Sequence, residues 1–187
     1  MAAPAALLLL TVVEGAAALL LFSGLRHLRN RSLLVHHLRV HQVAPRWSIT
    51  PVARALPATS LLVGGVAIAA PLLAAAVAPG RWPAAARGVA AGTAVVYLMF
   101  LAYLSLLHRR DPAAPCGCLG SGDERTDRSL VRAAVLAAAS VLAASPWLLP
   151  ALTAVSGWRL LVPLASAIGI ATVAATTVLS PRRIEMT

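Results

Sequence analysis

Long apolar stretches constrain this chain more than any other feature of its sequence. Runs of about 20 mostly apolar residues recur along it, and each run lies between polar or Pro/Gly-containing segments. A transmembrane helix needs about 20 such residues, and backbone groups inside the hydrocarbon layer must bond within their own helix. The sequence therefore predicts about five transmembrane helices, at residues 4–25, 56–78, 84–107, 130–150 and 158–179.

The composition supports the same class of protein. Hydrophobic residues make up 59% of the chain and charged residues only 12%, whereas soluble proteins average roughly 45–50% apolar residues. The runs are too rich in alanine and leucine for barrel strands, which alternate between apolar and polar residues. We therefore expect an all-α integral membrane protein, with one membrane domain over residues 1–187.

The segment between the first two apolar runs, residues 28–45, mixes leucine and valine with arginine and histidine and ends at Pro45. This pattern predicts an amphipathic segment in the headgroup layer, where arginine stems lie along the apolar boundary and their charged heads contact phosphates. Trp47 is predicted to lie at the membrane–water interface, where tryptophan anchors the end of a spanning helix. No Lys or Arg precedes Arg26, so residues 4–25 are predicted to be a retained helix and not a signal peptide.

The charge distribution predicts the orientation in a bacterial inner membrane. All sixteen basic residues are arginine, and the net charge is +10. The first loop, the third loop with the start of the apolar run that follows it, and the tail hold every arginine except Arg81, Arg87 and Arg159. Arginine-rich short loops remain cytoplasmic, so the N-terminus is predicted outside and the third loop inside. Anionic lipid headgroups are the expected partner of these arginines, and nucleic acid is not.

The third loop, residues 108–128, contains the only two cysteines of the chain, Cys116 and Cys118, on either side of Gly117. A disulfide between residues two apart closes almost no chain and so gives little entropic stabilisation. It also needs a sharply bent backbone, which Gly117 permits. Because a strained, exposed bridge is easily reduced, the spacing favours thiol–disulfide exchange.

Two other interpretations of the cysteines stay open. Structural zinc needs four ligands, and this loop offers two thiolates with His108 as the nearest imidazole, so a subunit interface would have to supply the rest. The cysteines could also be incidental small residues, although a turn rich in proline and glycine is a poor place for buried side chains.

The loop and its surroundings resemble a known family. "PCGCLG" between two hydrophobic helices, followed by a polar stretch and "LVRAAVLAAAS", resembles the MauE family of methylamine-utilisation membrane proteins, which is related to DoxX/DoxD-type redox-associated proteins. The resemblance covers roughly residues 20–145 and includes Arg132, which matches an arginine early in the family's next helix. The motif itself matches at Cys116, Gly117, Cys118 and Gly120. Leu119 replaces a phenylalanine, and Ser60 stands where an acidic residue is expected.

This resemblance implies a thiol–disulfide oxidoreductase-type activity. The protein would assist disulfide formation or maturation of a client, such as the disulfide-rich small subunit of methylamine dehydrogenase, beside a thioredoxin-like protein. Cys116 and Cys118 would be the redox pair with support from Arg132, and electrons would pass to another protein, a small thiol or a quinone. Such clients mature outside, whereas the charge bias places the loop inside. The alternative is a non-catalytic membrane subunit or assembly scaffold with structural or metal-bound cysteines.

Three further features of the sequence are candidates for function. Glu14 lies in the middle of the first apolar run, where a carboxylate is either functional or protonated and bonded to a neighbouring helix. His37 and His41 share one helical face; they could form part of a metal site, bind a quinone or headgroup, or line a solvated surface. Gly88 and Gly92, four apart, permit close helix packing within the bundle or in a homo- or hetero-oligomer.

Overall fold

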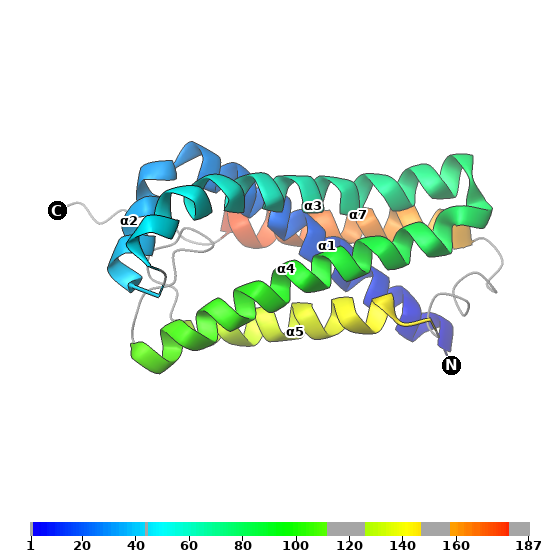
Figure 1. The fold of residues 1–187 in the computed structure, drawn as a ribbon. Coiled ribbons are helices and arrows are strands. Elements are labelled where there is room, and N and C mark those ends of the chain that lie inside the picture. The colour runs from blue at the N-terminus through cyan, green and yellow to red at the C-terminus, as the bar shows by residue number, and fades with distance from the viewer. Residues whose placement is uncertain (1, 44, 112–125, 147–157, 180–187) are drawn as a thin grey trace.

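The structure, a computed structural model, describes residues 2–43, 45–111, 126–146 and 158–179. This part of the chain forms a bundle of long helices in which successive members run in opposite directions (Figure 1). The long helices are α1 (Ala2–Arg29), α3 (Ile49–Val77), α4 (Trp82–Arg110), α5 (Thr126–Ala144) and α7 (Trp158–Leu179). Between them lie a shorter helix and two 3₁₀ turns, α2 (Arg31–His41), η1 (Arg46–Ser48) and η2 (Pro79–Arg81).

Helices of membrane-spanning length are present, as the apolar runs predict. Three segments of the described residues are long and apolar enough to cross a bilayer: Leu7–Arg29, Arg46–Val77 and Trp82–Arg110. The described apolar part of α7, Val162–Ala174, is shorter, and α5 carries three charged residues in its first two turns. The all-helical architecture is therefore confirmed, while the number of five spans stays a prediction.

Helix α1 is the centre of the bundle and contacts each of the other four long helices. Within the 18-residue apolar stretch of each candidate span, 50% is buried in α1, compared with 28% in the span that includes α3 and 33% in α4. Small residues allow the close approach. A Cβ atom at Gly64 of α3 would lie 2.7 Å from the Ala17 carbonyl oxygen, and one at Gly169 of α7 would lie 2.7 Å from the Gly15 nitrogen. The α1 backbone therefore packs directly against glycines of α3 and α7.

The glycine pair that the sequence singles out does not make such a contact. No described atom lies within 4 Å of a Cβ placed at Gly88 or Gly92. Both glycines belong to α4, whose buried face is formed by other residues, among them Ala86, Ala90 and Ala94. Within the described bundle, the close approaches thus occur at glycines such as Gly64, Gly169 and Gly24, and not at the pair in α4.

Helix α2 is held against the start of α3 by one apolar cluster. Leu34 and Leu38 pack there against Ile49 and Ala53. The helix ends where Gln42 adopts a left-handed conformation with φ of 50°. It lies inside the segment 28–45 that the sequence marks as amphipathic; Leu34 and Leu38 are buried, while Leu33 and Val40 are exposed.

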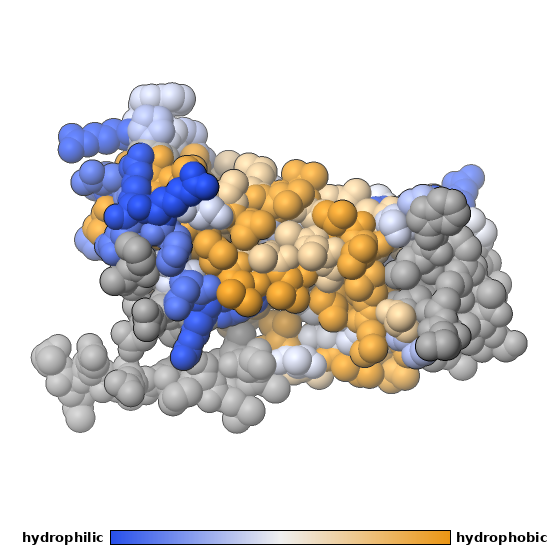
Figure 2. Space-filling model, turned by 90° about the horizontal axis from the view of Figure 1, so that it is seen from below, coloured by the Kyte–Doolittle hydropathy of each residue, from blue (hydrophilic) through white to orange (hydrophobic). Residues whose placement is uncertain are grey.

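Charge and hydrophobicity separate along the bundle. Figure 2 shows an apolar band across the middle of the molecule and strongly hydrophilic side chains gathered at one end. That end carries α2, the C-terminal ends of α1 and α4, and the N-terminal ends of α3 and α5 (Figure 1). These helix ends hold most of the arginines, while Arg81 and Arg87 lie at the opposite end. We call the first of these the arginine-rich end.

Candidate functional site at the arginine-rich end

The predicted redox residues belong to the segment that joins α4 to α5. Cys116, Gly117 and Cys118 lie outside the described residues. The structure does describe both helix ends from which this segment departs, Arg110 of α4 and Thr126 of α5, and both are at the arginine-rich end (Figure 1). The candidate site is therefore built from the described side chains around these two helix ends.

The small residues of α5 determine which face of the helix is buried. Thr126, Ser129, Ala133, Ala137 and Ser140 are buried, at the spacing of one helical face. This face lies against α1 and α4, the helices with which α5 makes most of its contacts. The helix begins at Thr126. Asp127 lies in its first turn, where its Oδ1 accepts a hydrogen bond from the Arg128 backbone N–H at 3.0 Å.

A cavity of about 60 Å³ lies between α1, α4 and α5. Its polar lining comes from Ser23 of α1, Tyr97 of α4, and Ser129 and Arg132 of α5. Apolar residues such as Leu104 and Phe100 form the remainder and most of the surface. The volume is enough for a few water molecules or one small polar group. Arg132, which the sequence proposes as a supporting residue, therefore borders an interior space shared by three helices.

Arg132 and the N-terminus of α5 place positive charge along the first two turns of this helix, where Asp127 also stands. Arg132 is half-buried and stands six residues after Thr126, about 9 Å along the helix axis. Side chains on a helix lean toward its N-terminus, which is also the positive end of the helix dipole. Ser129 is only 7% exposed, and its hydroxyl has no partner among the described residues. The Ser129 hydroxyl and Arg132 thus follow the end of the cysteine segment by three and six residues along α5.

Tyr97 closes the inner side of the cavity. Its hydroxyl donates a hydrogen bond to the Ala16 carbonyl oxygen at 2.8 Å, and its side chain is buried. The bond connects α4 to the central helix α1 and holds the ring in place. Sequence reasoning did not select Tyr97 or Ser129. The sequence does contain a feature that could identify them: both are polar residues next to or inside an apolar run, and such a group needs a hydrogen-bond partner or a cavity.

Glu14 is buried between α1 and α7, with 2% of its surface exposed. Its carboxyl group is hydrogen-bonded to the Ser166 side chain. Because the Ser166 hydroxyl donates its proton to the Val162 carbonyl oxygen at 3.1 Å, a protonated Glu14 is the natural donor to Ser166. Burying an ionised carboxylate without a cation is expensive. The surroundings thus favour a neutral glutamic acid that bonds α1 to α7, beside the contact of Gly15 with Gly169.

A Glu14→Gln substitution tests this role. Glutamine keeps the size and a donor toward Ser166, so the free energy of unfolding should change by less than about 1 kcal/mol. Glu14→Ala, which removes the bond and leaves a void, should lower it by about 2 kcal/mol or more. Thermal unfolding of the purified protein in detergent measures both variants. A Gln variant that is stable but inactive in a redox assay would instead show that the Glu14 carboxyl group is needed for function.

The histidines of α2 face two different environments. The Nδ1 atom of His41 lies 2.7 Å from the Tyr103 hydroxyl of α4, so this side chain links the two helices. The rings of His37 and His41 are 5.7 Å apart, and burial, followed by the charge of neighbouring His36, lowers the pKa of His37. Among the described residues, no three His, Cys, Asp or Glu side chains gather as a metal site would require. The geometry of His41 is that of a structural hydrogen bond.

The C-terminal end of α2 is also bound to the end of α4 by Arg110, whose guanidinium donates to the Gln42 carbonyl oxygen. Helix α2 is therefore connected to the residue that immediately precedes the cysteine segment. Tyr103, like Tyr97, was not selected from the sequence. Its signal is the same: a tyrosine near the end of an apolar run usually has a hydrogen-bond partner.

The apolar helices define a helical membrane protein whose cysteine segment joins the arginine-rich ends of α4 and α5. The family model of methylamine utilisation protein MauE matches residues 5–146. This match spans most of the chain, from α1 to the end of α5, so the protein belongs to the MauE family. The family resemblance noted in the sequence is thereby confirmed. No curated protein and no solved structure matches the chain.

Proposed function

We propose that this MauE-family protein is a membrane thiol–disulfide redox protein that uses Cys116 and Cys118 to assist disulfide formation or maturation of a partner protein. The observation that carries the proposal is that the cysteine segment joins α5 at its N-terminus, with the Ser129 hydroxyl and Arg132 three and six residues further along that helix. Positive charge and a helix N-terminus both lower the pKa of a nearby thiol and so increase its thiolate fraction. The cysteine segment enters α5 at this point.

The reaction is a two-step exchange. A thiolate of the client attacks one sulfur of the Cys116–Cys118 disulfide, which forms a mixed disulfide and releases the other cysteine as a thiolate. The second client thiolate then attacks the mixed disulfide, so the client gains a disulfide and the protein is left with two thiols. Two electrons and two protons have moved to the protein. A thioredoxin-like disulfide, a small-molecule disulfide or a quinone restores the Cys116–Cys118 bond and takes them up.

The proposed setting is a bacterial inner membrane. In this arrangement α5 and α7 form the fourth and fifth spans, beside the three helices of spanning length. The arginine-rich end faces the cytoplasm because arginines near helix ends are retained on that side. The N-terminus is then outside, and the cysteine segment is at the cytoplasmic face.

Alkylation of the two cysteines by a membrane-impermeant maleimide tests redox state and sidedness together. Inverted membrane vesicles should show no labelling before treatment with a reductant and two labels per chain afterwards, because only free thiols react. Intact spheroplasts should stay unlabelled in both conditions. The Cys116→Ser/Cys118→Ser variant, which has no other cysteine, is the matched control for background labelling.

Three results would contradict parts of this proposal. Equal labelling with and without reductant would exclude a disulfide in the resting protein. Labelling that requires a chelator and not a reductant would identify the cysteines as metal ligands, as the scaffold alternative allows. Labelling in spheroplasts would place the cysteine segment outside, on the side where the clients implied by the family resemblance mature.

A further inference from the structure

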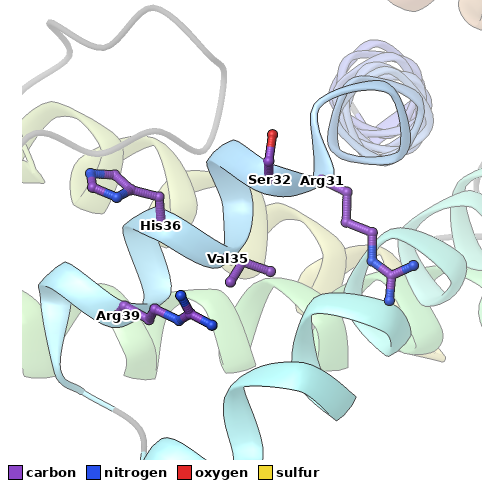
Figure 3. Close-up of a pocket in the computed structure, with 5 residues that line it drawn as sticks. All are labelled: Arg31, Ser32, Val35, His36 and Arg39. Atoms are coloured by element: carbon purple, nitrogen blue, oxygen red, sulfur yellow. The ribbon is translucent and has the colours of Figure 1, made fainter.

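Helix α2 carries a shallow depression on its surface, with a volume of about 530 Å³. Figure 3 shows the residues that line it, all of them from α2: Arg31, Ser32, Val35, His36 and Arg39. Four of these five side chains have polar groups that can donate hydrogen bonds, and none is acidic. A surface of this composition is suited to an anion.

The two arginines are placed to act together. Arg31 and Arg39 are two helical turns apart, about 12 Å along the axis, and Val35 stands between them on the same face. In Figure 3 both guanidinium groups point toward the same side of α2, on either side of Val35. The adjacent buried face, formed by Leu34 and Leu38, packs against α3. This packing sets the rotation of α2 and keeps the arginines on the outside.

No carboxylate of this region neutralises the arginines. The sequence contains no Asp or Glu between Glu14 and Asp111, a stretch that includes α2, α3 and α4. Within the described part of the chain, Arg31 and Arg39 form no ion pair. An anion that neutralises them must therefore come from another molecule.

The depression lies at the level of a membrane surface. The spanning segment Arg46–Val77 begins just after α2. Large apolar side chains are exposed around the same region: Leu33 is 44% exposed, Val40 60% and Trp47 82%. Exposed apolar residues beside arginines, with a tryptophan at the start of a spanning helix, are typical of a segment that lies among lipid headgroups.

We propose that this depression binds the phosphate group of an anionic phospholipid. The guanidinium groups of Arg31 and Arg39 contact the phosphate oxygens, and Ser32 and His36 supply further hydrogen bonds. Val35 contacts the apolar part of the lipid between them. The site is independent of the cysteine chemistry, and it anchors α2, which is bonded through His41 and Gln42 to the end of α4.

Native mass spectrometry of the full-length protein in a neutral detergent tests the proposal. Phosphatidylglycerol is titrated as the probe, with phosphatidylcholine and inorganic phosphate in parallel. Wild-type protein should bind phosphatidylglycerol in preference to both. The Arg31→Gln/Arg39→Gln variant should lose about 10- to 30-fold in affinity, because each basic residue near an anionic surface strengthens binding by roughly five-fold. Arg31→Lys/Arg39→Lys, which retains the charge, should keep most of the binding and shows that loss in the first variant is not misfolding.

Arg46→Gln/Arg54→Gln is the matched control, since it removes the same charge from the same end of the molecule but outside the depression. It should bind phosphatidylglycerol nearly as wild type does. Equal losses in both double variants would overturn the site in favour of general attraction to a basic surface. Unchanged binding in the Arg31→Gln/Arg39→Gln variant would overturn it outright. Tighter binding of inorganic phosphate than of the lipid would identify a free anion as the ligand instead.

Discussion

Replacing both Cys116 and Cys118 with serine is expected to reduce client maturation to the level of a strain that lacks the protein. Serine is close to cysteine in size but cannot form a disulfide, so no electron pair can be exchanged. The chain contains no other cysteine that could substitute. Methylamine-dependent growth of the complemented deletion strain measures the effect, together with the thiol content of the client.

The single variants Cys116→Ser and Cys118→Ser sharpen this experiment. Each retains one thiol, which can attack the disulfide of an oxidised thioredoxin-like protein or client but leaves no second cysteine to resolve the bond. One of them should therefore accumulate a mixed disulfide, visible as a reducible adduct on a gel. The cysteine retained in that variant is the one that bonds to the partner. Membrane levels and helix content of all variants should equal those of the wild type. Full client maturation in the double variant would favour the scaffold function and refute the redox proposal.

The second large effect is expected for Gly64→Ala in α3. The added Cβ would lie 2.7 Å from the Ala17 carbonyl oxygen and 2.8 Å from the Leu21 amide nitrogen. Both atoms belong to the backbone of α1 and cannot move without separating the two helices. Overpacking of this kind lowers the free energy of unfolding by about 1–3 kcal/mol. Thermal unfolding of the purified variant in detergent measures the loss.

Gly65→Ala is the matched control, since it makes the same change one residue further along the same helix. There the nearest atom, Leu21 Cδ1, lies 3.6 Å away, an ordinary contact. Replacing a glycine inside a helix with alanine stabilises it by about 0.5–1 kcal/mol, so the two variants should differ in sign. A destabilised Gly65→Ala variant, or a Gly64→Ala variant as stable as wild type, would contradict the packing of α1 against α3.

Much of the architecture could be predicted from local sequence. Hydrophobicity summed over about 20 residues identifies a spanning helix without reference to its neighbours, and the segments that include α1, α3 and α4 have the expected length. The alternation of leucine with arginine and histidine likewise marks the segment that contains α2. The Cys-Gly-Cys turn is contiguous in the chain, so its family could be recognised without a structure.

The contacts of individual residues could not be predicted as well from the sequence. Gly88 and Gly92 have the spacing of a packing motif, yet the close contacts are made by other glycines, among them Gly64 and Gly169. The difference depends on which face α4 turns toward the bundle, which spacing alone does not reveal. Similarly, the pair His37 and His41 suggests a shared ligand, whereas His41 bonds to Tyr103, 62 residues further along.

The sequence by itself determined that this is a helical membrane protein, where its long apolar helices lie, and that both of its cysteines belong to one three-residue stretch. The helices follow from the transfer of short segments from water to lipid, and the free energy of that transfer depends only on the residues of each segment. Only the tertiary structure decided which backbones touch, that Glu14 bonds to Ser166, and that Arg132 shares a cavity with Tyr97. These depend on the rotation and separation of helices from distant parts of the chain, which only the packing of the whole bundle sets.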